Sequence, residues 1–149
     1  MTYSVRPLDF TTLQWAADVA GPRMVVEEYQ RPELLNMEHF YKGLIDMIQS
    51  GTGLVGFKDE TPVGFVGSLL LPHFLNPERK VLAEVMWWVD PNFRESRIGL
   101  LLLKEFTALA DRVADEASLS TLPSTPVKKE TLAKMGFEWK ELGFLYKVK

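Results

Sequence analysis

The stretch from Val81 to Phe106 constrains the fold of this chain more than any other. It begins with an apolar run that carries a single carboxylate, Glu84, and it then turns at Asp90-Pro91-Asn92. A short apolar run that ends at turn residues is typical of a buried strand, and the leucine-rich continuation has the spacing of a helix. We therefore predict a strand over residues 81–89 and a helix over residues 97–114, joined by a basic loop.

The loop between this strand and this helix is suited to bind a phosphate group. The first backbone N–H groups of a helix lack partners within the helix, and the positive end of the helix dipole lies beside them. Gly99 falls in the first turn of the predicted helix, where it lets a ligand approach the backbone closely. The junction therefore predicts a phosphate-bearing ligand.

The pattern V-D-P-x-x-R-x-x-x-I-G-x-x-L-L, read from Val89 to Leu103, resembles the acetyl-CoA-binding motif of the GNAT N-acyltransferase superfamily. The family loop reads R/Q-x-x-G-x-G/A, and the pyrophosphate of coenzyme A lies on its backbone amides. This chain has Arg97 where the family usually has a glycine. Arg97 either obstructs the pyrophosphate or adds a guanidinium to it, and the sequence leaves both readings open.

The resemblance implies acetyl-CoA as a co-substrate and assigns residues to its binding. In the family, the backbone just before the proline pairs with the pantetheine arm like an added strand, and the loop holds the pyrophosphate. Thr125 stands where many members have an asparagine near the cofactor. The implied cofactor-binding residues are Trp87, Trp88, Val89, Arg94, Glu95, Ser96, Arg97, Ile98, Gly99 and Thr125.

Glu84 is the candidate catalytic base. Strand alternation predicts that it shares a face with Leu82, Met86 and Trp88, where a carboxylate is unfavourable unless it is used or paired. Desolvation there would raise its pKa. The position also resembles the glutamate with which many GNAT members deprotonate the amine, directly or through water. The alternative is an ordinary carboxylate that pairs with a basic residue of a neighbouring strand.

The general acid is less well defined. Many GNAT enzymes have a tyrosine on the last helix, four residues before the Gly-Phe pair, and that position is Leu132 here. Tyr29, Tyr41, Tyr146 or a water molecule could replace it, and the enzyme could also work without an acid.

The remaining chain predicts an α/β fold with a GNAT-like mixed sheet of six to seven strands and about four helices on both faces. We expect a single domain over residues 1–149, with a loop at 72–80 and a helix stop at Gly21-Pro22. The expected strands are 2–8, 54–57, 62–71, 81–89, 118–122, 137–141 and 144–148, and the expected helices are 9–20, 32–50, 97–114 and 128–135.

Composition excludes several classes of function. The absence of cysteine excludes disulfides, thiolate metal sites and a cysteine nucleophile, and His39 and His73 are too few to indicate a metal centre. The net charge of −3 gives no sign of binding to nucleic acid or to a membrane. The N-terminus lacks the pattern of a signal peptide, and we expect a cytoplasmic protein.

The resemblance to the GNAT superfamily implies an N-acetyltransferase in which a primary amine of a small molecule or a protein attacks acetyl-CoA directly. The alternative is a catalytically degenerate member that works by binding another protein, and Leu132 and Arg97 are the features that favour it. By analogy with the family, residues 144–148 are a candidate interface of a homodimer.

The acceptor would be selected by the helix over 32–50, the segment 23–31 and the loop over 72–80. Four acids in the first two of these segments could attract a cationic amine, although a run of acids is more often a solvated face. They are Glu27, Glu28, Glu33 and Glu38.

Overall fold

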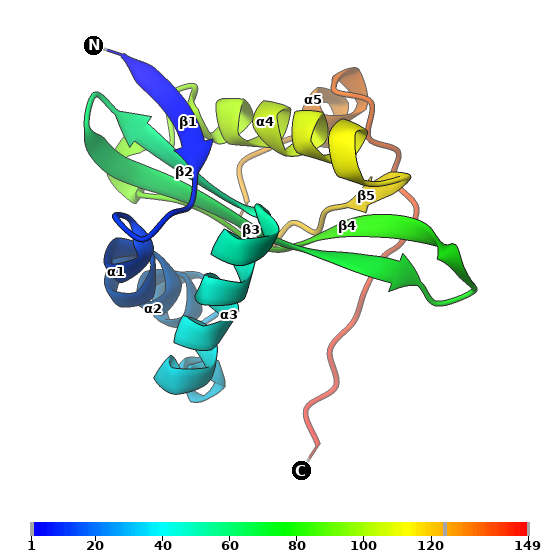
Figure 1. The fold of residues 1–149 in the computed structure, drawn as a ribbon, viewed down its shortest axis with the longest axis horizontal. Helices are drawn as coiled ribbons and strands as arrows, with labels where there is room; N and C mark the ends of the chain where they lie inside the picture. The colour runs from blue at the N-terminus through cyan, green and yellow to red at the C-terminus, as the bar shows by residue number, and fades with distance from the viewer. Residues whose placement is uncertain (1, 124, 149) are drawn as a thin grey trace.

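The computed structural model describes residues 2–123 and 125–148 and has a five-stranded sheet with helices on both faces (Figure 1). The strands lie in chain order, and neighbours are antiparallel except for the last two, which are parallel. They are β1 (Tyr3–Pro7), β2 (Gly53–Lys58), β3 (Thr61–His73), β4 (Asn76–Val89) and β5 (Glu116–Ser118). The mixed α/β fold is confirmed, whereas the expected count of six to seven strands is wrong.

The two missing strands are those expected at 137–141 and 144–148, where the described residues form no strand. A strand forms only where a neighbour pairs with its backbone, and β5, at the edge of the sheet, has three residues. Phe137 packs against the core below α4, whereas the apolar side chains after it are exposed, with Phe144 and Val148 both 89% exposed.

The first helical segment does not stop at Gly21-Pro22 as predicted. It continues past Pro22 to Glu28. On each side of this proline there is a π-helical turn, in which an N–H group donates to the carbonyl five residues back. These bonds run from Gly21 N to Ala16 O and from Tyr29 N to Met24 O. The parts of the segment are α1 (Leu13–Trp15), η1 (Ala16–Ala20), α2 (Gly21–Arg23) and η2 (Met24–Glu28).

The helices predicted over 97–114 and 128–135 begin and end within a residue of the predicted places. The helix predicted over 32–50 begins only at Met37, because the backbone at Leu35 and Asn36 is extended. Asn36 caps α3 through its side chain, which accepts a hydrogen bond of 3.0 Å from His39 N–H, and Gly51 ends it with φ at 70°. Figure 1 shows α1, α2 and α3 on one face of the sheet and α4 on the other. The remaining helices are α3 (Met37–Ser50), α4 (Ile98–Val113), α5 (Lys129–Lys134), η3 (Pro32–Leu34) and η4 (Pro91–Phe93). None of the described helices is long and apolar enough to span a bilayer.

Two strand glycines let α4 lie directly on the sheet. A Cβ atom on Gly56 would be 2.8 Å from Ile98 Cγ1, and one on Gly64 would be 2.9 Å from Leu102 Cδ1. Both contacts are too short, so a side chain at either position would force Ile98 or Leu102 to move. The packing fixes the first turn of α4 beside the end of β4.

The predicted loop over 72–80 is wrong, because β3 and β4 pair as far as His73 and Asn76 and form one long hairpin. The tip of this hairpin exposes Phe74 and Leu75 by 97% and 82%. Continuous antiparallel pairing leaves only the tip unpaired, which places these residues away from the sheet centre (Figure 1).

Candidate active site

A cavity of about 420 Å³ lies where β4 ends and α4 begins. β5 pairs with β4 over Val81 to Ala83, and among the described residues no strand continues along that edge toward Val89. The free backbone edge of β4 is therefore available to a ligand. The cavity is lined by Met24, Glu28, Trp87, Trp88, Val89, Arg94, Ser96, Gly99, Leu100, Leu122, Thr125, Pro126, Val127, Lys128 and Thr131.

The first turn of α4 is prepared for an anion. Ser96 Oγ donates to Phe93 O at 2.6 Å and accepts from Ile98 N at 3.3 Å, which fixes the loop before the helix. A Cβ atom on Gly99 would make ordinary contacts of 3.7 Å with Val89 and 3.8 Å with Trp87. The protein itself therefore does not require glycine here, and the missing side chain leaves room on the cavity side for a ligand.

Most of the predicted cofactor residues lie together in this cavity. The predicted residues that line it are Trp87, Trp88, Val89, Arg94, Ser96, Gly99 and Thr125. Among the described residues, the cavity wall does not include Glu95, Arg97 or Ile98. Ile98 is fully buried in the core under α4, Glu95 is exposed, and the Arg97 guanidinium lies 5.8 Å from the centre of the Tyr3 ring. The guanidinium of Arg97 thus neither fills the cavity nor lines it.

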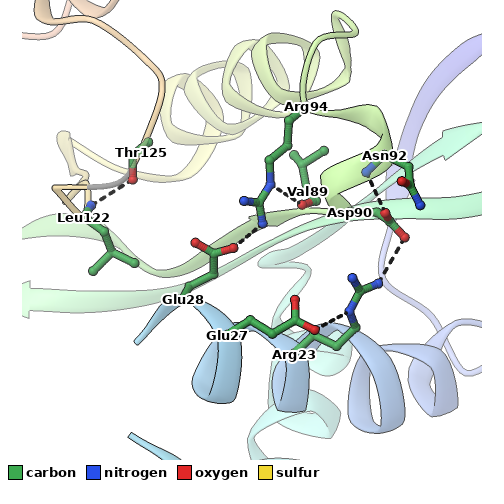
Figure 2. A network of polar contacts seen from close by, with 9 residues as sticks. All are labelled: Arg23, Glu27, Glu28, Val89, Asp90, Asn92, Arg94, Leu122 and Thr125. Carbon is green, nitrogen blue, oxygen red and sulfur yellow. Dashed lines mark hydrogen bonds and ion pairs between the residues drawn. The ribbon is translucent and has the colours of Figure 1, made fainter. Parts of the chain in front are cut away.

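Two arginines join the end of the first helical segment to the end of β4 (Figure 2). Arg23 pairs with Asp90 at 3.2 Å and with Glu27 at 3.1 Å. Arg94 donates from Nε to Val89 O at 2.9 Å and forms an ion pair with Glu28. Neither link follows from the sequence, because the paired residues lie 67 and 66 positions apart and no local pattern joins them.

The candidate base, Glu84, lies at a bulge of β4. Ser68 pairs with Glu84 and Gly67 with Met86, which leaves Val85 without a partner on β3. The bulge reverses the alternation, so Leu82 packs on the α4 side while Met86 and Trp88 pack on the opposite side. The prediction that these three residues share one face with Glu84 is therefore wrong.

The environment of Glu84 keeps its carboxyl group protonated to unusually high pH. Burial raises its pKa from 4.5 to about 7, and the hydrogen bond from Ser120 N–H, at 3.2 Å, opposes the shift. Burial raises the pKa of Tyr29, and the charge of Glu84 adds to this shift. Of the other candidate acids, Tyr41 is 36% and Tyr146 is 75% exposed.

A second cavity, of about 620 Å³, lies next to the first and shares Glu28 and Leu122 with it. It is lined by Glu27, Glu28, Tyr29, Gln30, Arg31, Leu34, Leu122, Pro123 and Leu145. Part of the segment expected to select the acceptor therefore faces this cavity. Among residues 2–123 and 125–148, no group of histidines and carboxylates has the geometry to hold a metal ion.

The fold and this site agree with a known family. The model of the acetyltransferase (GNAT) family matches residues 12–137, and the chain belongs to that family. No curated protein matches the chain.

Solved structures of the same fold cover almost the whole chain. A GCN5-related N-acetyltransferase from Ralstonia eutropha JMP134 has 23% identity over 99% of each chain and a TM-score of 0.72. AAC(6')-Iy, in complex with a CoA-linked bisubstrate analogue, has 16% identity over 100% of this chain and 99% of its own, with a TM-score of 0.71. A predicted acetyltransferase from Clostridium acetobutylicum, solved with acetyl-CoA, has 13% identity over 95% and 96%, with a TM-score of 0.73. At these identities the likeness shows the fold.

Proposed function

We propose that this chain is an acetyl-CoA-dependent N-acetyltransferase that acts on a primary amine. The observation that carries the proposal is the cavity between the free edge of β4 and the first turn of α4, with the raised pKa of Glu84 on the same strand. The backbone of Trp87 to Val89 would hold the pantetheine arm. Arg94, Gly99 and Lys128 line the same cavity and would surround the pyrophosphate.

The transfer would proceed by direct attack. The amine nitrogen forms a bond to the thioester carbonyl carbon, the carbon–sulfur bond breaks, and the thiolate leaves and takes up a proton. Glu84 would accept the proton that the amine loses, directly or through water, and a pKa of about 7 is suited to this task. Tyr29, whose raised pKa keeps it protonated, would donate a hydrogen bond near the reacting groups.

The acceptor in this proposal is an amine of a small molecule. Two proteins of the same fold carry the name aminoglycoside acetyltransferase, which supports a cationic acceptor. The alternative of a degenerate protein-binding member is not favoured. One of its two supports was Arg97, whose side chain lies over Tyr3 and leaves the cavity open.

We also propose a cytoplasmic homodimer in which residues 137–148 pair with a second copy. The exposed Phe144, Tyr146 and Val148 alternate along this segment, as they would in a strand with a partner. Light scattering on the purified protein should give twice the mass of the chain. Phe144→Ser together with Tyr146→Ser should return it to the mass of one chain, and an unchanged mass would contradict this interface.

Calorimetric titration with acetyl-CoA tests the proposed activity first. We expect saturable binding with a Kd on the order of micromolar, about −8 kcal/mol, and no binding of ATP. A panel of amines assayed for release of free thiol then identifies the acceptor. Absence of acetyl-CoA binding at millimolar concentration would overturn the proposal.

A further inference from the structure

The guanidinium of Arg94 is held between two groups of this chain. It donates to Val89 O and pairs with the carboxylate of Glu28 (Figure 2). The two side chains are only 30% and 18% exposed, so the pair is less screened by water than a surface ion pair. Both residues line the first cavity. A carboxylate therefore stands where the negative pyrophosphate of the donor would meet Arg94.

Glu28 also lines the second cavity, and so it belongs to the wall that the two cavities share. The neighbouring arginines have other carboxylates: Arg23 pairs with Glu27 and Asp90, and Arg31 pairs with Glu33. Arg94 is therefore the cation that the described part of the chain provides for Glu28. When Arg94 pairs with another anion, the carboxylate of Glu28 loses its cation and requires another one.

We propose that Glu28 exchanges cations during the reaction: it neutralises Arg94 before the acyl donor binds, and afterwards it holds a positively charged group of the acceptor. This inference rests on the proposed acetyltransferase function. A pyrophosphate attracts the guanidinium and repels the carboxylate. A partly buried carboxylate left without a cation is unfavourable, and an acceptor that brings one into the second cavity relieves this state.

The exchange defines the class of acceptor. The attacking amine must be neutral, whereas the group at Glu28 must be charged, so the acceptor needs at least two amino groups. The acceptor is therefore a small polyamine or amino sugar rather than a monoamine. Because coupling between two sites is reciprocal, donor and acceptor should each strengthen the binding of the other.

The donor side of the exchange is tested by titrating acetyl-CoA into the wild type, Glu28→Gln and Glu27→Gln. Glu28→Gln frees Arg94, and we expect about tenfold tighter binding, which corresponds to about 1.4 kcal/mol. Glu27→Gln removes the same charge from a carboxylate that pairs with Arg23, and we expect binding within about twofold of the wild type. Glu28→Asp, which keeps the charge but withdraws it from Arg94, should lie between the two.

The acceptor side is tested with diaminobutane and butylamine, which share a carbon chain and differ by one amino group. With acetyl-CoA, the wild type should acetylate diaminobutane but not butylamine, whose single amine is charged when it pairs with Glu28. Saturating desulfo-CoA should also tighten diaminobutane binding to the wild type at least about fivefold. Glu28→Gln should abolish this coupling.

The two proposals fail in different ways. If the wild type binds acetyl-CoA and Glu28→Gln binds it no more tightly, the proposed exchange of cations is wrong, and the proposed acetyltransferase function is not affected. Equal tightening by Glu27→Gln, or equal acetylation of butylamine and diaminobutane, would also overturn the exchange. If neither the wild type nor any variant binds acetyl-CoA, the proposed function is wrong and the exchange falls with it.

Discussion

The candidate active site has two sides, which the proposed function makes a cofactor side and an acceptor side, and they are built in different ways. The cofactor side comes largely from one stretch of chain, Trp87 to Gly99, in which a strand, a turn and the start of a helix follow one another. The wall of the second cavity is assembled from separate places: the end of the first helical segment and the segments around Leu122 and Leu145. Glu84, the proposed base, is not in the lining of either cavity and lies at the bulge of β4. Only the geometry of the cofactor side follows from a local sequence pattern.

This difference explains which side-chain substitutions each side tolerates. A site made by backbone groups at a strand edge and a helix end keeps its shape when side chains change. A site made by Glu28, Tyr29 and Glu84 depends on long-range packing and on the charge of each group. We therefore expect substitutions on the acceptor side to change the chemistry, and substitutions on the cofactor side to change donor affinity.

The largest effect is expected from Glu84→Gln. Loss of a general base should lower kcat by about a hundredfold to ten-thousandfold, with acetyl-CoA binding kept. In the wild type kcat/KM should rise with pH up to about 7, where the carboxyl group loses its proton, and then level off. The variant should lack this rise. Wild-type turnover with the same pH profile would remove Glu84 from the mechanism.

The same residue should make the folded protein less stable at high pH. The pKa of Glu84 is about 7 in the folded state and 4.5 as the unshifted value. Between these values the unfolded state loses its proton first, so the free energy of unfolding falls by up to about 3 kcal/mol as pH rises through this window. Glu84→Gln has no such proton to lose. Between about pH 5 and about pH 8, the free energy of unfolding measured in urea should therefore fall less for this variant than for the wild type. Equal falls in the two proteins would show that the folded environment of Glu84 does not raise its pKa.

The sequence predicted the cofactor side because its signals are local. An apolar run, a turn at Asp90-Pro91-Asn92 and a leucine-rich helix fix the positions of Val89, Arg94 and Gly99 almost without reference to the rest of the chain. The predicted α4 is correct to within a residue at each end. Three residues of the predicted loop, Glu95, Arg97 and Ile98, point elsewhere, since a helix start turns its side chains in several directions.

The sequence named Glu28, Tyr29 and Glu84 as candidates but not how they are placed, for a physical reason. The bulge at Val85 reverses the faces of β4, and alternation alone cannot locate a bulge. The continuation of the first helical segment past Pro22 carries Glu28 to Arg94, although proline usually stops a helix. The two terminal strands were expected from alternation, which requires a partner strand that this chain does not supply among its described residues.

Gly99→Ala is the sharpest test of the cofactor side. The protein has room for the added methyl group, and alanine is favoured over glycine within a helix, so the melting temperature should not fall. A ligand lying on the first turn would meet the methyl group, and we expect acetyl-CoA to bind about tenfold more weakly, or about 1.4 kcal/mol. Calorimetry and thermal unfolding of the same preparation separate the two effects. Unchanged affinity would show that the donor does not approach the backbone at Gly99.

The smallest effect is expected from Tyr29→Phe, and it decides whether the acceptor side holds a second catalytic group. The variant keeps the ring that packs in the core and removes only the hydroxyl group. If that group donates a hydrogen bond to the reacting atoms, kcat should fall about threefold to tenfold, in line with one hydrogen bond of about 1 kcal/mol. Tyr41→Phe, on the exposed part of α3, is the matched control and should leave kcat unchanged. An equal kcat for Tyr29→Phe and the wild type would leave Glu84 as the only side chain to which we assign proton transfer, with water protonating the thiolate.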